Sequence, residues 1–332
     1  MKNIFLLKGG YKIFGGLYLG WGIGANNAAN IFSTAVATYA IRYGTAVILI
    51  AIFVTVGAMA EGTGLFLSNS TKFSQEATPN LALIATLSAA VTINIITYLS
   101  IPTSTSQAAI GAFMGIAIAS SGLRAVAWSK FSKMMICWIF HPIIGLVLCI
   151  VLIKTLYPLF DRFIKSTVAK NRTLKVCFVI FGCYGAYALG ANNVVVTTSS
   201  YYQAGMFGAI GTRAAALWAA AIGGVSIALG ALTYGRKVMV TIGKRITPLD
   251  PFSALIVVLV HSMTLHFFTQ LNVPVSSSHA VVGAVIGAGL LHGVRTVNKN
   301  TLIKIFAGWI TTPLVSALLA YSIARLLNLA VL

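Results

Sequence analysis

Long apolar stretches alternate with short polar gaps along the whole chain of 332 residues. An α-helix needs about 20 mainly apolar residues to cross a bilayer. The alternation of apolar and polar residues that marks membrane β-strands is absent. The pattern therefore predicts an all-α polytopic membrane protein. The expected segments are 13–40, 45–67, 81–99, 108–123 and 134–156, followed by 176–198, 214–234, 253–271, 280–294 and 302–326.

Two segments, 108–123 and 280–294, are short for a full crossing, which is typical of re-entrant or broken helices. If each pairs with the segment before it as a helical hairpin, each half of the chain makes an odd number of crossings. The second half is then inverted relative to the first. If only the short segments are re-entrant, the crossings are even in number and the halves are parallel. We expect the inverted arrangement, with helical hairpins.

Four short motifs occur twice, in the same order. Gly-Ala-Asn-Asn occupies 24–27 and 190–193, and Pro-x-Ser-x-Ser occupies 102–106 and 274–278. The other two are a Gly-Ala-x-x-x-Gly run, at 57–62 and 230–235, and Trp-x-x-x-Pro, at 138–142 and 309–313. This order indicates an internal duplication into two inverted-topology repeats of about five helical segments each. The predicted units are a first membrane repeat at 1–153, a basic cytoplasmic linker at 154–175 and a second membrane repeat at 176–332.

Composition narrows the class of protein further. Hydrophobic residues make up 58% of the chain and charged residues 8%, which excludes a water-soluble globular protein. The acidic residues are only Glu61, Glu76, Asp161 and Asp250, so an enzyme built on a carboxylate cluster is not expected. We expect no enzymatic activity, no cofactor and no metal beyond a sodium ion.

The net charge of +19 comes from basic residues in the gaps between apolar stretches. This placement indicates contact with the lipid bilayer and argues against nucleic acid as a partner. With residues 154–175 in the cytoplasm, the linker side collects more Lys and Arg than the opposite side. The positive-inside rule then places both termini outside a plasma (inner) membrane.

Polar residues inside apolar helices mark the candidate site. Asn at membrane depth often binds a ligand or an ion, although a single Asn also serves to join helices. Each Pro-x-Ser-x-Ser run predicts a turn, a hydroxyl-bearing cap and a helix start, which provides N–H groups for an anion without Lys or Arg. Ordinary capping is the alternative for each run taken singly. The expected substrate-binding residues are Asn26, Asn27, Ser104, Thr105, Ser106, Asn192, Asn193, Ser276, Ser277 and Ser278.

Together these motifs resemble the inorganic phosphate transporter (PiT) family, whose members have a Gly-Ala-Asn-Asp elbow in each half and a Pro-x-Ser-Thr-Thr-His-like hairpin after it. The resemblance covers nearly the whole chain. It implies a secondary active transporter, a symporter of an inorganic tetrahedral oxyanion with phosphate as the default, coupled to sodium or protons, and a homodimer. Candidates for the coupling ion are Asn30, Gln107, Thr197, His279 and Glu61.

The elbow Asp of the family is replaced by Asn27 and Asn193 in this chain. A carboxylate is a natural ligand for a hard cation and accepts a hydrogen bond from the hydroxyl of phosphate, whereas an amide also donates. The replacement weakens the expectation of sodium and adds weight to sulfate, which has no proton to donate. Phosphate versus sulfate, and sodium versus proton, both stay open, and an anion channel is the remaining alternative.

Overall fold

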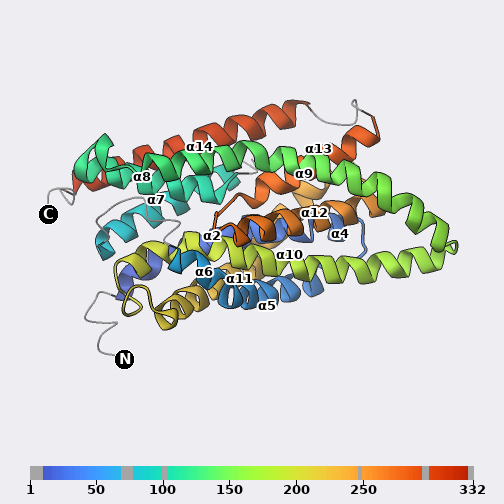
Figure 1. The fold of residues 1–332 in the computed structure, drawn as a ribbon, viewed down its shortest axis with the longest axis horizontal. Helices are drawn as coiled ribbons and strands as arrows, with labels where there is room; N and C mark the ends of the chain where they lie inside the picture. Colours follow the sequence, from blue (N-terminus) through green and yellow to red (C-terminus); the bar gives the residue numbers. More distant parts are fainter. Residues whose placement is uncertain (1–9, 69–77, 99–102, 246–248, 294–298, 328–332) are drawn as a thin grey trace.

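The computed structural model describes residues 10–68, 78–98, 103–245, 249–293 and 299–327. Within these ranges the protein is helical and contains no strand (Figure 1). Seven of the described helices are long and apolar enough to cross a membrane. The prediction of an all-α polytopic membrane protein is confirmed.

The first crossing is interrupted at the first Asn pair. It runs through a 3-10 turn at Gly10–Ile13, helix α2 (Phe14–Ile23), a wide π-turn at Gly24–Ala28 and the short helices α3 (Ala29–Ile31) and α4 (Ser33–Ala37). A π-turn is rare and frequently marks a functional position in a helix. The second Asn pair differs, because it lies inside the unbroken helix α10 (Thr167–Gln203).

Two helical hairpins enter the molecule from opposite ends. Helices α7 (Pro79–Tyr98) and α8 (Thr105–Ser121) lie in the half that carries both termini, and α12 (Pro251–Gln270) and α13 (Ser277–Leu291) lie in the other half (Figure 1). Helices α8 and α13 each begin inside a Pro-x-Ser-x-Ser run. The remaining elements are α5 (Tyr43–Ala60), α6 (Gly62–Leu67), a 3-10 turn (Leu123–Ala125), α9 (Trp128–Phe163), α11 (Arg213–Arg245) and α14 (Lys299–Leu326).

The segment 154–175, predicted as a basic linker, consists of the end of α9 and the start of α10, joined by three non-helical residues at 164–166. Helices α9 and α10 have 36 and 37 residues, which at 1.5 Å per residue is about 55 Å each and exceeds the hydrocarbon core of a bilayer. Their ends project together beyond the other helices (Figure 1). Asp161 forms an ion pair with Lys170 across these two arms. The hydrogen bond and the charge of Lys170 hold the pKa of the Asp161 carboxyl below its usual value.

Close helix contacts at glycine interlock the two halves. A Cβ on Gly24 would overlap the Ile227 carbonyl oxygen, and a Cβ on Gly190 would overlap the Val54 carbonyl oxygen. The two contacts pair matching positions, so the first elbow packs on α11 and the second packs on α5. The hairpin helices also pack on the opposite half of the chain. Gly111 of α8 contacts Pro313 of α14, and Gly283 of α13 contacts Pro142 of α9.

The contact at Gly190 predicts a large effect of a single methyl group. We expect Gly190→Ala to lower the free energy of unfolding by about 2 kcal/mol, because the added Cβ forces α10 away from α5. The matched control is Gly44→Ala in the first turn of α5, where a Cβ meets nothing within 4 Å. Thermal unfolding of both purified variants in detergent tests this, and equal midpoints would contradict it.

Asp250 caps the second hairpin and gives a pH-dependent contribution to stability. Its Oδ1 atom accepts hydrogen bonds from the backbone N–H groups of Phe252 (2.9 Å) and Ser253 (3.1 Å). Burial raises the pKa of Asp250, but the hydrogen bonds of Ser253 and Phe252 and the nearby His292 outweigh it and leave the pKa below its usual value.

Because the pKa is lowered on folding, the ionised carboxylate stabilises the protein fully above its ordinary pKa of about 4. That stabilisation is lost as the pH falls through the lower pKa of the folded state. We expect Asp250→Ala to cost about 1 kcal/mol at pH 7. The difference in melting temperature from the wild type is expected to narrow in acid. Asp161→Ala on the exposed arm is the control and is expected to have little effect.

Candidate functional site

The first Asn of each pair holds the end of a hairpin arm. Asn26 Nδ2 donates a hydrogen bond to Thr97 Oγ1 (2.6 Å), and Asn192 Nδ2 donates to Thr269 Oγ1 (3.0 Å). Asn192 also donates to the Val273 carbonyl oxygen (3.0 Å) and accepts from the Val275 N–H (2.9 Å). The second elbow therefore fixes both sides of the turn between α12 and α13.

The second Asn of each pair meets the start of α8. Asn27 Nδ2 donates to Thr105 Oγ1 (2.7 Å), and Ser106 Oγ donates to Asn193 Oδ1 (3.4 Å). All four side chains are buried. Elbows from different halves thus converge on the first turn of one hairpin helix.

The two Pro-x-Ser-x-Ser runs begin helices, as predicted. Ser104 caps α8 by accepting from the Gln107 N–H (3.2 Å), and Ser276 caps α13 by accepting from the His279 N–H (3.4 Å). The remaining hydroxyls of the two runs, on Thr105, Ser106, Ser277 and Ser278, are buried. His261 Nε2 lies 2.8 Å from Ser277 Oγ.

The two hairpin tips are tied together by a reciprocal pair of hydrogen bonds. Ser106 Oγ donates to the Val275 carbonyl oxygen (3.0 Å), and Ser278 Oγ donates to the Thr103 carbonyl oxygen (2.7 Å). Ser106 and Ser278 occupy matching positions of the two motifs. The tips of hairpins that enter from opposite ends are therefore in direct contact.

Several buried polar atoms of the elbows have no hydrogen-bond partner. They are Asn26 Oδ1, Asn27 Oδ1, Asn30 Oδ1 and Asn193 Nδ2. A buried polar atom without a partner costs about 1–3 kcal/mol, so such a group points to a ligand or bound water. The amide nitrogen and the hydroxyls suit an oxyanion, and the amide oxygens suit a hard cation.

The proposed coupling-ion residues do not form one group. Asn30 belongs to the first elbow, whereas the Thr197 hydroxyl donates to the Val194 carbonyl oxygen of its own helix (2.7 Å). Gln107 and His279 line an apolar groove of about 720 Å³ between α8, α9, α13 and α14, together with Trp138 and Trp309.

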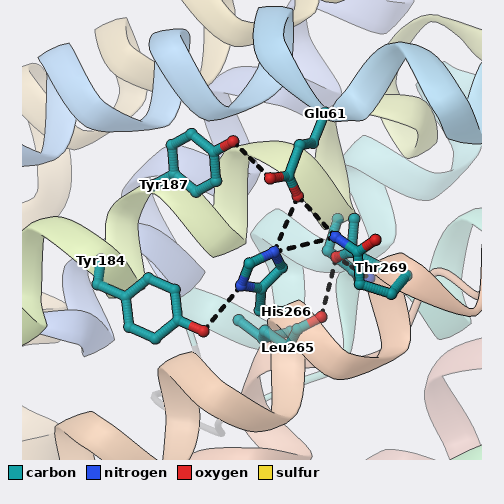
Figure 2. Close-up of polar contacts among 8 residues, drawn as sticks. Glu61, Tyr184, Tyr187, Leu265, His266 and Thr269 are labelled. Carbon is teal, nitrogen blue, oxygen red and sulfur yellow. Dashed lines mark hydrogen bonds and ion pairs between the residues drawn. The ribbon is translucent and has the colours of Figure 1, made fainter.

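Glu61 lies in a separate polar cluster, at the break between α5 and α6 (Figure 2). Its carboxylate forms hydrogen bonds with Tyr187 of α10 and with His266 and Gln270 of α12. Neither His266 nor Tyr187 was predicted from the sequence to belong to a site. No local pattern could have found them, because His266 is 205 positions from its partner.

Fold and site together define a helical membrane protein in which two buried Asn elbows meet the tips of two opposed hairpins. The family model described as "Phosphate transporter family" matches residues 23–168 and 161–320. The chain therefore belongs to the phosphate transporter family.

Relatives and a solved structure extend the comparison. The chain is 30% identical to a "Putative phosphate permease" of Pyrococcus furiosus, over 90% of each protein. It is 24% identical to "Inorganic phosphate transporter 2-1, chloroplastic" of Arabidopsis thaliana, over 92% of this chain and 70% of the relative. The structure of "The sodium-dependent phosphate transporter" superposes with a TM-score of 0.83, covering 98% of this chain and 99% of that one. At 22% identity, this match supports the fold. These proteins are described as permeases and transporters, which agrees with the expectation that the chain is not an enzyme.

Proposed function

We propose that this protein is a secondary active transporter of an inorganic tetrahedral oxyanion, with phosphate as the substrate. Family membership and the names of its relatives support phosphate. One observation carries the proposal: the amides of Asn27 and Asn193, from two different elbows, meet at the start of α8, and each has a buried atom without a partner. Helix N-termini and hydroxyls favour an anion without a basic side chain.

The oxyanion is held by both elbows and both hairpin tips. We assign substrate binding to Asn26, Asn27, Ser104, Thr105, Ser106, Asn192, Asn193, Ser276, Ser277 and Ser278. The Asn193 amide nitrogen, which has no protein partner, donates to a substrate oxygen. The hydroxyls of Ser106 and Ser278 bond the opposite tip in the present state and become available when the tips separate.

Transport proceeds by opposite movements of two inverted repeats, 1–153 and 176–332, about this site. The matched glycine contacts and the entry of the hairpins from opposite ends support this mechanism. The basic arms at 154–175 face the cytoplasm of a plasma (inner) membrane and both termini lie outside, because the arm side collects more Lys and Arg. We also propose that the protein is a homodimer.

The transporter is a symporter coupled to sodium or to protons. The Oδ1 atoms of Asn27 and Asn30 are neutral oxygen ligands suited to sodium, whereas Glu61 and His279 suit a proton. The described residues place no carboxylate in either elbow, so a sodium ion there is held with little compensation of its charge.

Sulfate is the second candidate substrate, and the amides at 27 and 193 favour it. Sulfate offers no proton at neutral pH, so it needs donors only, and an amide supplies one where a carboxylate supplies none. Asn193 Nδ2 is such a donor.

Uptake into proteoliposomes tests the proposal. Radiolabelled phosphate and sulfate are presented in parallel, with sodium and pH gradients imposed separately. Concentrative uptake of either anion is the expected result and excludes an anion channel. If the protein transports neither phosphate nor sulfate under any of these gradients, the proposed function is overturned.

A further inference from the structure

Among the described residues, Glu61 is the one acidic side chain that contacts more than one of the long apolar helices. Asp161 lies on a projecting arm and Asp250 lies at the outer end of α12, whereas Glu76 is outside the described residues. Glu61 follows the last residue of α5 and faces Tyr187 of α10 and His266 of α12. The cluster therefore lies where three apolar helices meet, and a carboxylate among apolar helices is costly unless it is paired.

The carboxylate of Glu61 is surrounded by hydrogen-bond donors. Tyr187 Oη donates to Glu61 Oε1 (2.7 Å), and Gln270 Nε2 donates to Glu61 Oε2 (3.0 Å). His266 Nε2 lies 2.9 Å from the same oxygen (Figure 2). A sodium ion requires several oxygen acceptors around it, whereas the neighbours of this carboxylate are a hydroxyl, an amide nitrogen and a ring nitrogen. The cluster suits a proton.

His266 can gain and lose a proton without losing a hydrogen bond. Its Nε2 lies 2.9 Å from Glu61 Oε2 and 3.0 Å from Gln270 Nε2, and its Nδ1 lies 2.8 Å from Tyr184 Oη. Because a carboxylate only accepts, the tautomer that bonds Glu61 carries its proton on Nε2. In the neutral ring, Nδ1 accepts from the tyrosine hydroxyl. When a proton binds at Nδ1, the ring donates and the hydroxyl turns to accept. Tyr184 therefore fits either protonation state.

We propose that His266, paired with Glu61, binds the proton that is coupled to oxyanion transport. This inference rests on the proposed function. The pair is neutral overall when the proton is bound and carries one negative charge when it is not. A negative charge near the substrate site disfavours an anion, so proton and oxyanion favour each other's binding, and by linkage the effect is reciprocal. Glu61 and His266 are 32% and 27% exposed, so the pair is not sealed inside the helices.

A short chain of hydrogen bonds connects the pair to the substrate site. Thr269 lies on α12 between His266 and Gln270, and it accepts the hydrogen bond of Asn192 Nδ2. Asn192 in turn holds the turn of the second hairpin at Val273 and Val275. Movement of the last turn of α12, caused by the change of charge on His266, therefore reaches the hairpin tip directly.

The other titratable groups near the pair are few. Helix α10 contributes Tyr184 and Tyr187, and α5 and α6 contribute Glu61 itself. The remaining histidines of the neighbouring helices are directed elsewhere. His261 of α12 bonds Ser277, His141 of α9 packs its ring on Phe268, and His279 of α13 packs its ring on Trp309.

The test compares two modes of phosphate transport in proteoliposomes. Exchange of radiolabelled for unlabelled phosphate at equal pH requires transport and no driving ion. Accumulation of phosphate under an inward gradient of one pH unit requires proton coupling. With one proton per substrate, the internal phosphate concentration reaches about tenfold the external one. We expect His266→Gln and Glu61→Gln to keep exchange and to lose accumulation. His292→Gln, at a second histidine–carboxylate pair outside the membrane core (3.0 Å from Asp250), is the matched control and is expected to keep both.

Each result has a defined meaning. Wild-type protein that exchanges neither phosphate nor sulfate overturns the proposed function. Wild-type protein that exchanges phosphate but ignores the pH gradient overturns the proton site alone, as does full accumulation by His266→Gln. If His266→Gln loses exchange as well, Tyr184→Phe decides. Tyr184→Phe removes a hydrogen bond from both protonation states, and the bond donated by the charged ring is the stronger of the two. The pH of half-maximal exchange is therefore expected to fall, and an unmoved pH profile overturns the proposal.

Discussion

Asn192→Asp is expected to lower the initial rate of phosphate uptake about a hundredfold, although the two side chains have nearly the same shape. The amide nitrogen of Asn192 donates to the Val273 carbonyl oxygen and to Thr269. An aspartate places an oxygen against that carbonyl, with no proton between them, in a site that is fully buried. Loss of a buried hydrogen bond together with an unpaired buried charge costs about 3 kcal/mol or more. A free energy of that size corresponds to a rate about a hundredfold lower.

The matched variant is Asn26→Asp in the other elbow. Asn26 donates only to the Thr97 hydroxyl, which can turn and donate to a carboxylate instead. We therefore expect a much smaller fall for Asn26→Asp. Initial rates per folded protein in proteoliposomes give the comparison. Equal rates for Asn192→Asp and the wild type would show that the second hairpin tip does not depend on this elbow.

The order of the helical segments could be read from the sequence because burial in lipid demands long apolar runs. The positions at which the helices end could not be read from the sequence. The segment expected at 134–156 continues as helix to Phe163, since backbone hydrogen bonds of a helix do not require apolar side chains. The sequence also does not show that the two elbows differ in backbone, since only the first contains a π-turn. In the second, Val194 and its two following valines are packed in a continuous helix.

The candidate site was predictable as a set of residue types and not as a set of contacts. Duplicated Asn and Ser at membrane depth have few uses other than a polar site, so the motifs could be found directly. The reciprocal bonds of Ser106 and Ser278 join residues 169 and 175 positions apart, and only the fold brings them together. The same holds for Glu61, whose partners come from two other helices.

Changing both Asn27 and Asn193 to Asp is expected to raise the ratio of phosphate to sulfate transport by at least about tenfold. A carboxylate accepts a hydrogen bond from the hydroxyl that phosphate keeps near neutral pH, whereas it faces sulfate with two acceptors and a repulsive charge. The added charge is also expected to strengthen stimulation by sodium, because a carboxylate is the better ligand for a hard cation. Parallel uptake of the two labelled anions, with and without sodium, measures both effects.

The surroundings of the two amides allow these substitutions without loss of the fold. Asn193 Oδ1 already accepts from Ser106, so Asn193→Asp keeps that bond and replaces only the unpartnered Nδ2. At Asn27 the Thr105 hydroxyl must turn from acceptor to donor, which a hydroxyl can do. Asn193→Asp alone is therefore expected to be the milder change in stability, although it removes the free donor on which sulfate depends. If the ratio stays at the wild-type value in the single and double variants, the elbow amides do not contact the oxyanion.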